Sequence, residues 1–299
     1  MRVAVTNQKG GVGKTTTAIN LAAGLAKIGR RVLLVDLDPQ ANATTGVGVE
    51  HRGVERSVYD CLLGSLSAEA VIRKTDYPNL DLIPATIDLA GAELELVSAI
   101  ARETKLRSAL ERVTGYDVIF IDCPPSLGLL TINALTAAER ILIPIQCEYY
   151  ALEGLSQLLR NVELVRTGLN PTLEVAGIVL TMYDARTKLS EEVAGEVRKH
   201  FGDRVFTTII PRSVRLSEAP SYGQPAIAYE PSARGSRAYM WLAEEFDRRL
   251  LGGGPEPATV GSSQDGLAEE TPGPVERPPE NAESEMTSAD SAGHGEGAA

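Results

Sequence analysis

The sequence contains few cysteines and no long apolar run. Its 299 residues include three cysteines, Cys61, Cys123 and Cys147, which lie far apart and form no C-x-x-C pair. We therefore expect reduced thiols, as in a cytoplasmic protein, rather than a disulfide framework. No apolar run approaches the roughly 18 residues of a membrane-spanning helix, and the chain opens directly on a predicted strand, so we expect neither a membrane span nor a signal peptide.

Basic residues are scarce in the C-terminal segment. From Gly252 onward ten acidic residues face one base, Arg277, so this segment carries −9 of the chain's net charge of −11. Large apolar residues are rare there too, and we predict a disordered acidic tail over residues 252–299. Residues 1–251 are predicted to form one domain. Its net charge is close to neutral, which leaves room for a local basic patch.

Apolar segments of strand length alternate with segments of helical periodicity along the domain, and no internal repeat is present. Such alternation predicts an α/β fold with a mostly parallel, twisted sheet and helices on both faces. The segment 41–50 is rich in Gly, Thr and Asn and is predicted to be a mobile loop. Strands are predicted at 2–6, 31–36, 80–84, 116–122, 141–145, 175–180 and 205–210, and helices at 16–28, 89–100, 105–113, 127–137, 152–166, 190–201 and 236–250.

A glycine-rich stretch, residues 9–17, separates the first predicted strand from the first predicted helix. This order is the context of a phosphate-binding loop, in which glycines let backbone N–H groups point inward toward a helix N-terminus. Lys14 can reach the β- and γ-phosphates of a nucleotide, and the Thr15 hydroxyl can ligate Mg²⁺. We assign nucleotide contacts to Lys9, Gly10, Gly11, Val12, Gly13, Lys14, Thr15 and Thr16.

An acidic residue, Asp122, ends the apolar strand predicted at 116–122. Beside a phosphate-binding loop, this position is typical of a Walker B acid that holds Mg²⁺ through water. The alternative is that Asp122 caps the helix that follows.

The loop departs from the usual pattern G-x-x-x-x-G-K-[ST], because Gln8 replaces the first glycine and Lys9 follows it. Lys9 is either a solvated surface lysine or a contact to a nucleotide bound by a second copy of the protein. The run K-G-G-V-G-K-T-T-T resembles the deviant Walker A loop of the ParA/MinD ATPases, a branch of the P-loop NTPases. In that family the loop-initial lysine reaches across an ATP-sandwiched homodimer, and the resemblance implies the same role for Lys9.

The resemblance covers about residues 1–250 and implies further roles. Asp38, the second acid of D-L-D-P-Q, would orient the attacking water and, with Thr15 and Asp122, belong to the Mg²⁺ site, while Asp36 would be structural or lie behind the metal ligands. Catalysis would rest on Lys9, Lys14 and Asp38. Gly10 would face the second subunit, although turn geometry alone also explains a glycine there. Met182 and the pair Pro211 and Arg212 would flank the adenine.

The stretch from Ile210 to Gly223 resembles a motif of the ParA/Soj chromosome-segregation branch. Arg212 and Arg215 are three residues apart and are predicted to share a helix face. With Arg186, they are candidates for contacts to DNA phosphates without sequence readout, and Arg234 and Arg237 are further candidates. The alternative is a solvated charged face. The acidic tail is either inert or a weak competitor of DNA for these arginines.

Three functions are compatible with such a loop. The resemblance favours a cytoplasmic, nucleoid-associated partition ATPase that uses ATP and Mg²⁺, dimerises, binds nonspecific duplex DNA and is stimulated by a ParB-type protein. A MinD-like membrane-positioning ATPase would need a basic amphipathic C-terminal helix, whereas here the last helix precedes an acidic tail, so we expect no stable membrane binding. A reductase like the nitrogenase iron protein would need paired ligand cysteines, and Cys123 and Cys147 do not show that spacing. No N-terminal helix-turn-helix extension is expected.

Overall fold

A seven-stranded sheet forms the centre of the computed structural model, which describes residues 1–149 and 151–253. The strand order is β3-β4-β2-β5-β1-β6-β7, and every neighbouring pair is parallel except β3 with β4. The prediction of a mostly parallel sheet is therefore confirmed. The strands are β1 (Arg2–Val5), β2 (Val32–Asp36), β3 (Arg73–Lys74), β4 (Leu80–Ile83), β5 (Val118–Asp122), β6 (Arg140–Gln146) and β7 (Glu174–Thr181).

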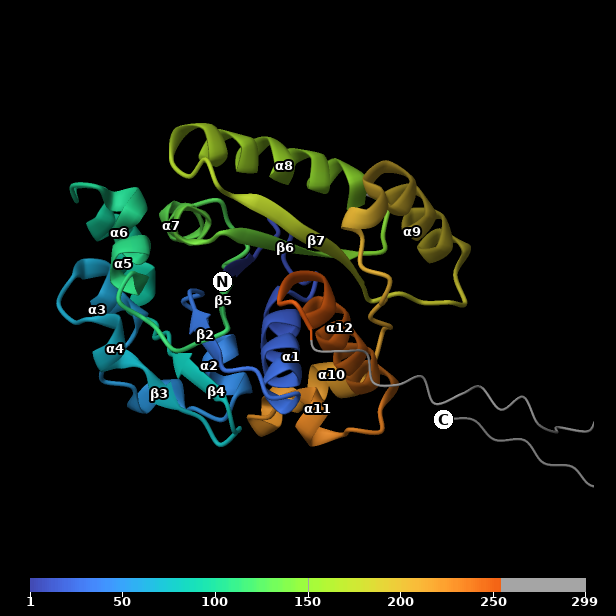
Figure 1. The fold of residues 1–299 in the computed structure, drawn as a ribbon, viewed down its shortest axis with the longest axis horizontal. Helices are drawn as coiled ribbons and strands as arrows, with labels where there is room; N and C mark the ends of the chain where they lie inside the picture. The colour runs from blue at the N-terminus through green and yellow to red at the C-terminus, as the bar shows by residue number, and fades with distance from the viewer. Residues whose placement is uncertain (150, 254–299) are drawn as a thin grey trace, which may run out of the picture. The chain divides into compact units, whose positions relative to one another are not determined.

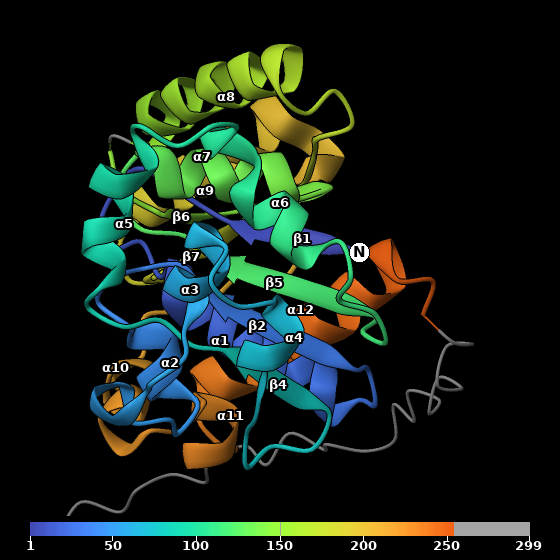
Figure 2. The same cartoon turned by 90° about the vertical axis from the view of Figure 1, so that its left-hand side faces the viewer.

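Helices cover both faces of this sheet (Figure 1). Figure 2 shows α7 and α8 on one face and α1 and α12 on the other. The helices are α1 (Lys14–Lys27), α2 (Asn42–Gly46), α3 (Val58–Leu63), α4 (Ala68–Val71), α5 (Leu89–Leu96), α6 (Lys105–Leu110), α7 (Leu129–Ala137), α8 (Ala151–Gly168), α9 (Lys188–Phe201), α10 (Val214–Glu218), α11 (Ala226–Tyr229) and α12 (Arg234–Leu250).

Successive side chains of the central strands supply two separate core layers. In β5, Val118 and Phe120 pack with α1 and α12, whereas Ile119 and Ile121 belong to the layer beneath α3 to α9. This follows from the two-residue period of a strand, because both faces of a parallel sheet are covered and both need apolar side chains. The sheet is thereby fixed from both sides, and its carboxyl edge becomes a rigid platform.

Helix α12 is held against α1 by close packing and by one buried hydrogen bond. A Cβ built on Gly24 of α1 would lie 2.8 Å from the Cβ of Ala243, so only glycine permits this approach. The hydroxyls of Thr17 and Tyr239 lie 3.0 Å apart in the same interface. The apolar face of α12 is therefore used inside the domain.

The segment 205–210 is not a strand, and that prediction was wrong. Val205 forms an isolated bridge with Ile178, and the N–H groups of Phe206 and Ile210 donate to the carbonyls of Ile178 (2.9 Å) and Leu180 (2.8 Å), but the segment forms no continuous ladder. The physical reason is the carboxylate of Glu245 on α12, which accepts hydrogen bonds from the backbone N–H groups of Thr207 (2.7 Å) and Thr208 (2.8 Å). A side chain thus takes the donors that a strand would give to its neighbour.

The predicted tail, 252–299, lies outside the described residues apart from Gly252 and Gly253, so its disorder stays a prediction. In the described part of the chain, no helix is long and apolar enough to cross a bilayer.

Candidate active site

The glycine-rich loop leads from the carboxyl end of β1 into the first turn of α1. Gly11 has a φ of 73° and Gly13 a φ of 87°, and these left-handed conformations favour glycine over any other residue. A Cβ at Gly13 would also lie against the Thr181 side chain at the end of β7. The loop is therefore shaped as the motif predicts, and its N–H groups lie at a helix N-terminus suited to phosphate.

Two side chains that the motif does not mark hold this loop in place. Asn7 donates from Nδ2 to the carbonyl of Pro144 (2.8 Å), while its Oδ1 accepts the N–H of Lys9 (3.0 Å). The Thr181 hydroxyl donates to the carbonyl of Val12 (2.8 Å). Sequence reasoning missed both because Asn7 stands just outside the loop pattern and Thr181 lies 169 residues from Val12 in the chain.

Lys14 lies buried at the start of α1, with its ammonium 3.3 Å from the carbonyl oxygen of Lys9. Burial lowers the pKa of Lys14, and the negative charge of Asp122 offsets part of that shift. A buried ammonium with a single hydrogen-bond acceptor, a backbone carbonyl, among the described residues is suited to a stronger anionic partner such as a phosphate.

Asp122 lies at the end of β5 with its carboxylate fully buried. Neither of its oxygens has a hydrogen-bond partner among the described residues. Burial, and then the negative charge of Asp36, raise its pKa well above the ordinary value. The nearby Thr15 hydroxyl and Lys14 offset part of that rise, without Thr15 completing a hydrogen bond. An orphaned buried carboxylate next to a Thr hydroxyl fits a hydrated Mg²⁺ better than it fits a helix cap.

In a Mg²⁺–nucleotide site the protein side chains supply only some of the metal ligands, and phosphate and water oxygens supply the rest. Within the described residues no group of three or more His, Cys, Asp or Glu side chains could hold a metal ion. Thr15 and Asp122 therefore suit a metal that also takes oxygens from phosphates and water, as Mg²⁺ does. The three cysteines are all buried and free.

Asp36 is a structural anchor at the end of β2. Its Oδ2 accepts the N–H and the hydroxyl of Thr44 at 2.7 Å each, and its Oδ1 accepts the N–H of Asp38 (3.1 Å). Burial raises the pKa of Asp36 to about 6, although the Thr44 hydrogen bonds pull it down. Because Thr44 lies in α2, the prediction of a loop over 41–50 was wrong for Asn42–Gly46, where the buried carboxylate fixes a short helix, whereas residues 47–50 form neither helix nor strand.

Asp38 is nearly buried two residues further on and accepts the N–H of Gln40 at 2.9 Å. Asp36 therefore positions the turn that carries Asp38 at the same edge of the sheet as Lys14 and Asp122. The three predicted acids and the loop thus meet in one place, as the carboxyl ends of parallel strands require.

A pocket of about 290 Å³ opens beside the loop. Five predicted nucleotide contacts line it, namely Gly13, Thr16, Met182, Pro211 and Arg212. Met182 has a φ of 51°, which turns the chain sharply after β7. Sequence reasoning missed further lining residues that come from α10 and α12, namely Leu216, Ser217 and Tyr239. A pocket of this size between a phosphate loop and apolar side chains suits a nucleobase.

Lys9 forms its ion pair with a residue outside the phosphate loop. Its ammonium pairs with Glu148 at 2.5 Å, and its side chain is 48% exposed. Gly10 next to it is exposed, and a Cβ built there meets no atom of the chain within 4 Å. The first residues of the loop are thus accessible at the protein surface.

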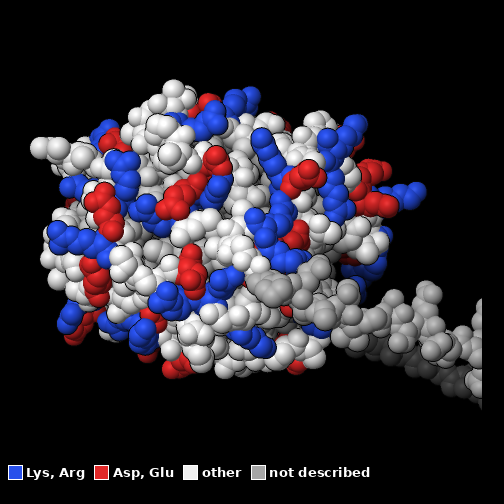
Figure 3. Space-filling model, viewed as in Figure 1, with Lys and Arg blue, Asp and Glu red and all other residues white. Residues whose placement is uncertain are grey.

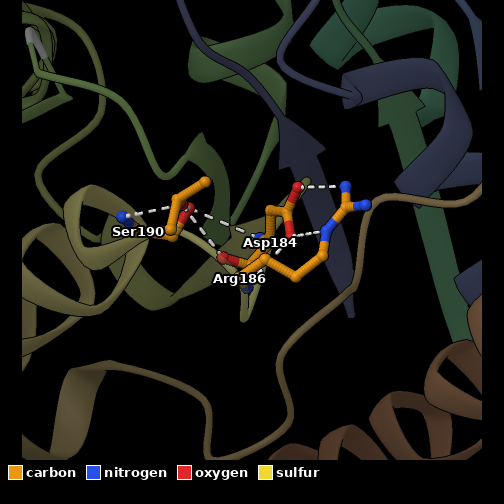
Figure 4. A network of polar contacts seen from close by, with 4 residues as sticks. Asp184, Arg186 and Ser190 are labelled. Atoms are coloured by element: carbon orange, nitrogen blue, oxygen red, sulfur yellow. Dashed lines mark hydrogen bonds and ion pairs between the residues drawn. The ribbon is translucent and has the colours of Figure 1, made fainter.

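Three segments enclose a groove of about 680 Å³, which we call the arginine groove. The groove is lined by residues 183–186 after β7, by residues between 209 and 214, and by one face of α12. It contains Arg186, Arg212, Arg234 and Arg237. Arg186 donates two hydrogen bonds to the Asp184 carboxylate, at 2.9 and 2.7 Å (Figure 4), and these lower the pKa of Asp184. Across residues 1–149 and 151–253, no acid forms an ion pair with Arg212, Arg234 or Arg237.

Arg215 does not line this groove. It lies on α10 and pairs with Glu218 at 2.7 Å. The prediction that Arg212 and Arg215 share a helix face was wrong, because α10 begins at Val214, after its N-cap Ser213, and so excludes Arg212.

Solved structures share this fold. A Mycobacterium smegmatis protein described as cobyrinic acid a,c-diamide synthase, with bound ATP analog and magnesium, matches with a TM-score of 0.71 and 41% identity over 81% of this chain and 92% of that one. The cell division ATPase MinD of Pyrococcus furiosus matches with a TM-score of 0.69 and 28% identity, over 83% of this chain and 98% of that one.

Comparison with known sequences identifies the family. Residues 1–175 match the family model of the AAA domain. The chain is 61% identical to the sporulation initiation inhibitor protein Soj of Bacillus subtilis, over 81% of this chain and 96% of that protein. It is 53% identical to the chromosome partitioning protein ParA of Caulobacter vibrioides, over 83% and 94% of the two chains. The chromosome-partitioning ATPase Soj of Thermus thermophilus is 54% identical, over 83% and 96%. The chain therefore belongs to the Soj/ParA family of chromosome-partitioning ATPases.

Proposed function

We propose that this ATPase closes into a homodimer around ATP and Mg²⁺, binds duplex DNA without sequence preference in that state, and releases DNA when a ParB-type partner stimulates hydrolysis. The observation that carries the proposal is the arginine groove, since it shares Pro211 and Arg212 with the nucleotide pocket. ParA and Soj relatives at 53–61% identity support the setting in chromosome segregation, and with it a cytoplasmic, nucleoid-associated location.

Each residue of the loop has a distinct role in this proposal. Lys14 binds the β- and γ-phosphates, and Thr15 and Asp122 hold Mg²⁺, which neutralises charge on the phosphate oxygens. Asp38, placed by Asp36, orients the attacking water. Phosphoryl transfer depends mostly on position and charge, so Asp38 need not be a strong base. Replacing Asp38 with Ala should leave ATP binding intact and stop turnover.

Lys9 acts in the second subunit of the proposed dimer. Its exposed ammonium is held by one exposed carboxylate, and such pairs contribute about 0.2–1 kcal/mol, so Lys9 exchanges Glu148 for a phosphate at little cost. A lysine supplied in trans resembles an arginine finger, which is worth on the order of 10³–10⁵ in rate. An isolated subunit is then nearly inactive, and hydrolysis depends on dimerisation.

DNA binding is assigned to Arg186 and Arg212 in the groove, with Arg234 and Arg237 beside them, and to Arg215 on α10, outside the groove. The face in Figure 3 carries Lys and Arg interspersed with Asp and Glu, so a uniform basic surface does not explain DNA binding there. Three phosphate contacts per subunit, doubled in a dimer, give a salt slope of roughly −5. A single subunit would bind weakly, which couples DNA binding to ATP.

A MinD-like membrane function is the second candidate, but it needs a free amphipathic helix near the C-terminus. The apolar face of α12 packs against α1, with Tyr239 and Ala243 buried. This packing favours the DNA function over membrane attachment.

The deciding experiment measures binding to random-sequence duplex DNA with ATP, with ADP and without nucleotide, over a salt series. We expect binding with ATP alone and a steep salt slope. Arg186→Ala should weaken it and reduce the slope by about 1 per subunit. Arg166→Ala is the matched control, because Arg166 on α8 also pairs with a nearby acid, Glu163 (3.0 Å), but lies outside the groove. Absence of DNA binding in every nucleotide state would overturn the proposal.

A further inference from the structure

One aromatic side chain in the arginine groove is not explained by phosphate binding. Trp241 is the chain's single tryptophan, lines the groove, and is 57% exposed. A single exposed aromatic side chain is common on protein surfaces, but this indole lies in a groove lined by arginines, where a ligand can reach it.

The position of Trp241 on α12 places it in line with two arginines. Arg234, Arg237 and Trp241 are spaced by three and four residues, which brings them onto one helix face. The neighbouring residues Ala238 and Leu242 are buried and hold α12 in the domain. The indole is thus free of the packing that fixes its helix.

Apolar side chains line part of the groove, and its charged lining residues are four arginines and Asp184, which pairs with Arg186. Ile209, Pro211 and Ala238 line it together with Val214, which is 71% exposed. Phosphates need only the cations. Apolar surface beside an exposed indole suits the flat faces of nucleobases, on which aromatic side chains stack.

We propose that the arginine groove also binds single-stranded DNA, with Trp241 stacking on an unpaired base. The inference rests on the proposed function, because the same arginines hold the phosphates of both DNA forms. Bases inside a duplex stack on one another and expose only their edges in the grooves. Unpaired bases expose their faces, and a basic groove with an aromatic platform is the arrangement that holds them.

Intrinsic fluorescence tests the contact directly, because Trp241 is the chain's only tryptophan. The full chain with ATP is titrated with a thymidine homopolymer and with a random-sequence duplex of equal length. We expect the homopolymer to quench the emission strongly and the duplex to quench it weakly. Absence of quenching by a homopolymer that binds overturns the inference.

Variants test the energetic contribution by anisotropy of labelled DNA. Trp241→Ala should weaken homopolymer binding by roughly 5- to 150-fold, the range measured for losing one stacked base, and change duplex binding less than twofold. Trp241→Phe should restore much of the loss. Leu164→Ala is the control, since Leu164 on α8 is 71% exposed outside the groove and should change neither affinity. Unchanged ATP binding shows that each variant is folded.

The outcomes separate the inference from the function on which it rests. Duplex binding without homopolymer binding, or equal losses for both DNA forms in Trp241→Ala, overturns the inference and leaves the proposed function standing. Failure of the ATP-bound chain to bind either form overturns the proposed function itself.

Discussion

Two variants that we expect to be inactive, Lys9→Ala and Asp38→Ala, test whether these residues act on one nucleotide from different subunits. Asp38 lies in the turn fixed by Asp36, at the same sheet edge as the loop of its own subunit. Lys9 is half exposed and pairs with Glu148, outside the loop. If Lys9 acts in trans, a complete site needs Asp38 from one chain and Lys9 from the other.

The expected recovery follows from the symmetry of a dimer. Neither variant homodimer has a complete site, so each alone should fall by about 10³–10⁵ in rate, as for loss of an arginine finger. In a mixed dimer, the subunit with intact Asp38 receives Lys9 from its partner and is complete, while the other site lacks both groups. Equal mixing makes about half of the dimers mixed, so turnover should return to about a quarter of wild type.

Phosphate release is measured at saturating ATP with duplex DNA present, for each variant alone and for the equal mixture. Lys27→Ala, which removes an exposed lysine at the end of α1, is the control for charge and should behave as wild type. No recovery in the mixture, when sedimentation shows that mixed dimers form, would refute action in trans. Addition of Gly10→Val to the Asp38→Ala chain should abolish the recovery by blocking the interface.

Three further predictions concern the carboxyl edge of the sheet and the loop beside it. Thr44→Val removes a donor to the buried Asp36 and the acceptor of the Ala85 N–H (3.0 Å), so urea unfolding should show a loss of about 3–5 kcal/mol, whereas Thr44→Ser should recover most of it. Gly10→Val should leave monomer stability and ATP binding unchanged, because its Cβ meets nothing within the chain, but should prevent the ATP-dependent dimer in sedimentation. The Asp36 pKa rises from 3.8 to about 6, so the folded state holds a proton that the unfolded chain has lost; this group's contribution to the free energy of unfolding should fall by about 2–3 kcal/mol between pH 4 and 6. Asp36→Asn should remove that part of the pH slope in urea titrations, and an unchanged slope would contradict it.

The sequence predicts the phosphate loop and the sheet because both depend on local pattern. Gly11 and Gly13 have positive φ values that other residues rarely adopt. The two glycines in the sequence therefore indicate the backbone conformation of the loop before the fold is known. The apolar runs ending in Asp36 and Asp122 are readable as buried parallel strands, and the rule that ligands bind at strand carboxyl ends then places both acids. A capping box formed by Ser57 and Asp60 marks the start of α3, a helix that was not predicted from the sequence.

Interactions between distant segments account for the predictions that failed. The residues 205–210 have strand-like composition, yet Glu245, nearly 40 residues later, takes the backbone donors of Thr207 and Thr208. The Gly- and Thr-rich segment 41–50 has loop-like composition, yet the Asp36 carboxylate orders it through Thr44. In both cases a buried carboxylate requires hydrogen-bond donors, and they come from a segment whose local sequence does not indicate the interaction.

The nucleotide pocket and the arginine groove share part of their lining, so the two proposed ligands would lie on either side of the same residues. Pro211 and Arg212 line both cavities. This segment is tied to the end of β7 by two backbone hydrogen bonds, from Tyr183 N–H to Ile210 (3.1 Å) and from Arg212 N–H to Tyr183 (3.0 Å). On α12, Tyr239 lines the pocket while its neighbour Ala238 lines the groove. If the proposed sites are right, a nucleobase in the pocket would contact the same backbone that carries a DNA-binding arginine, and the two sites would communicate without a path through the rest of the domain.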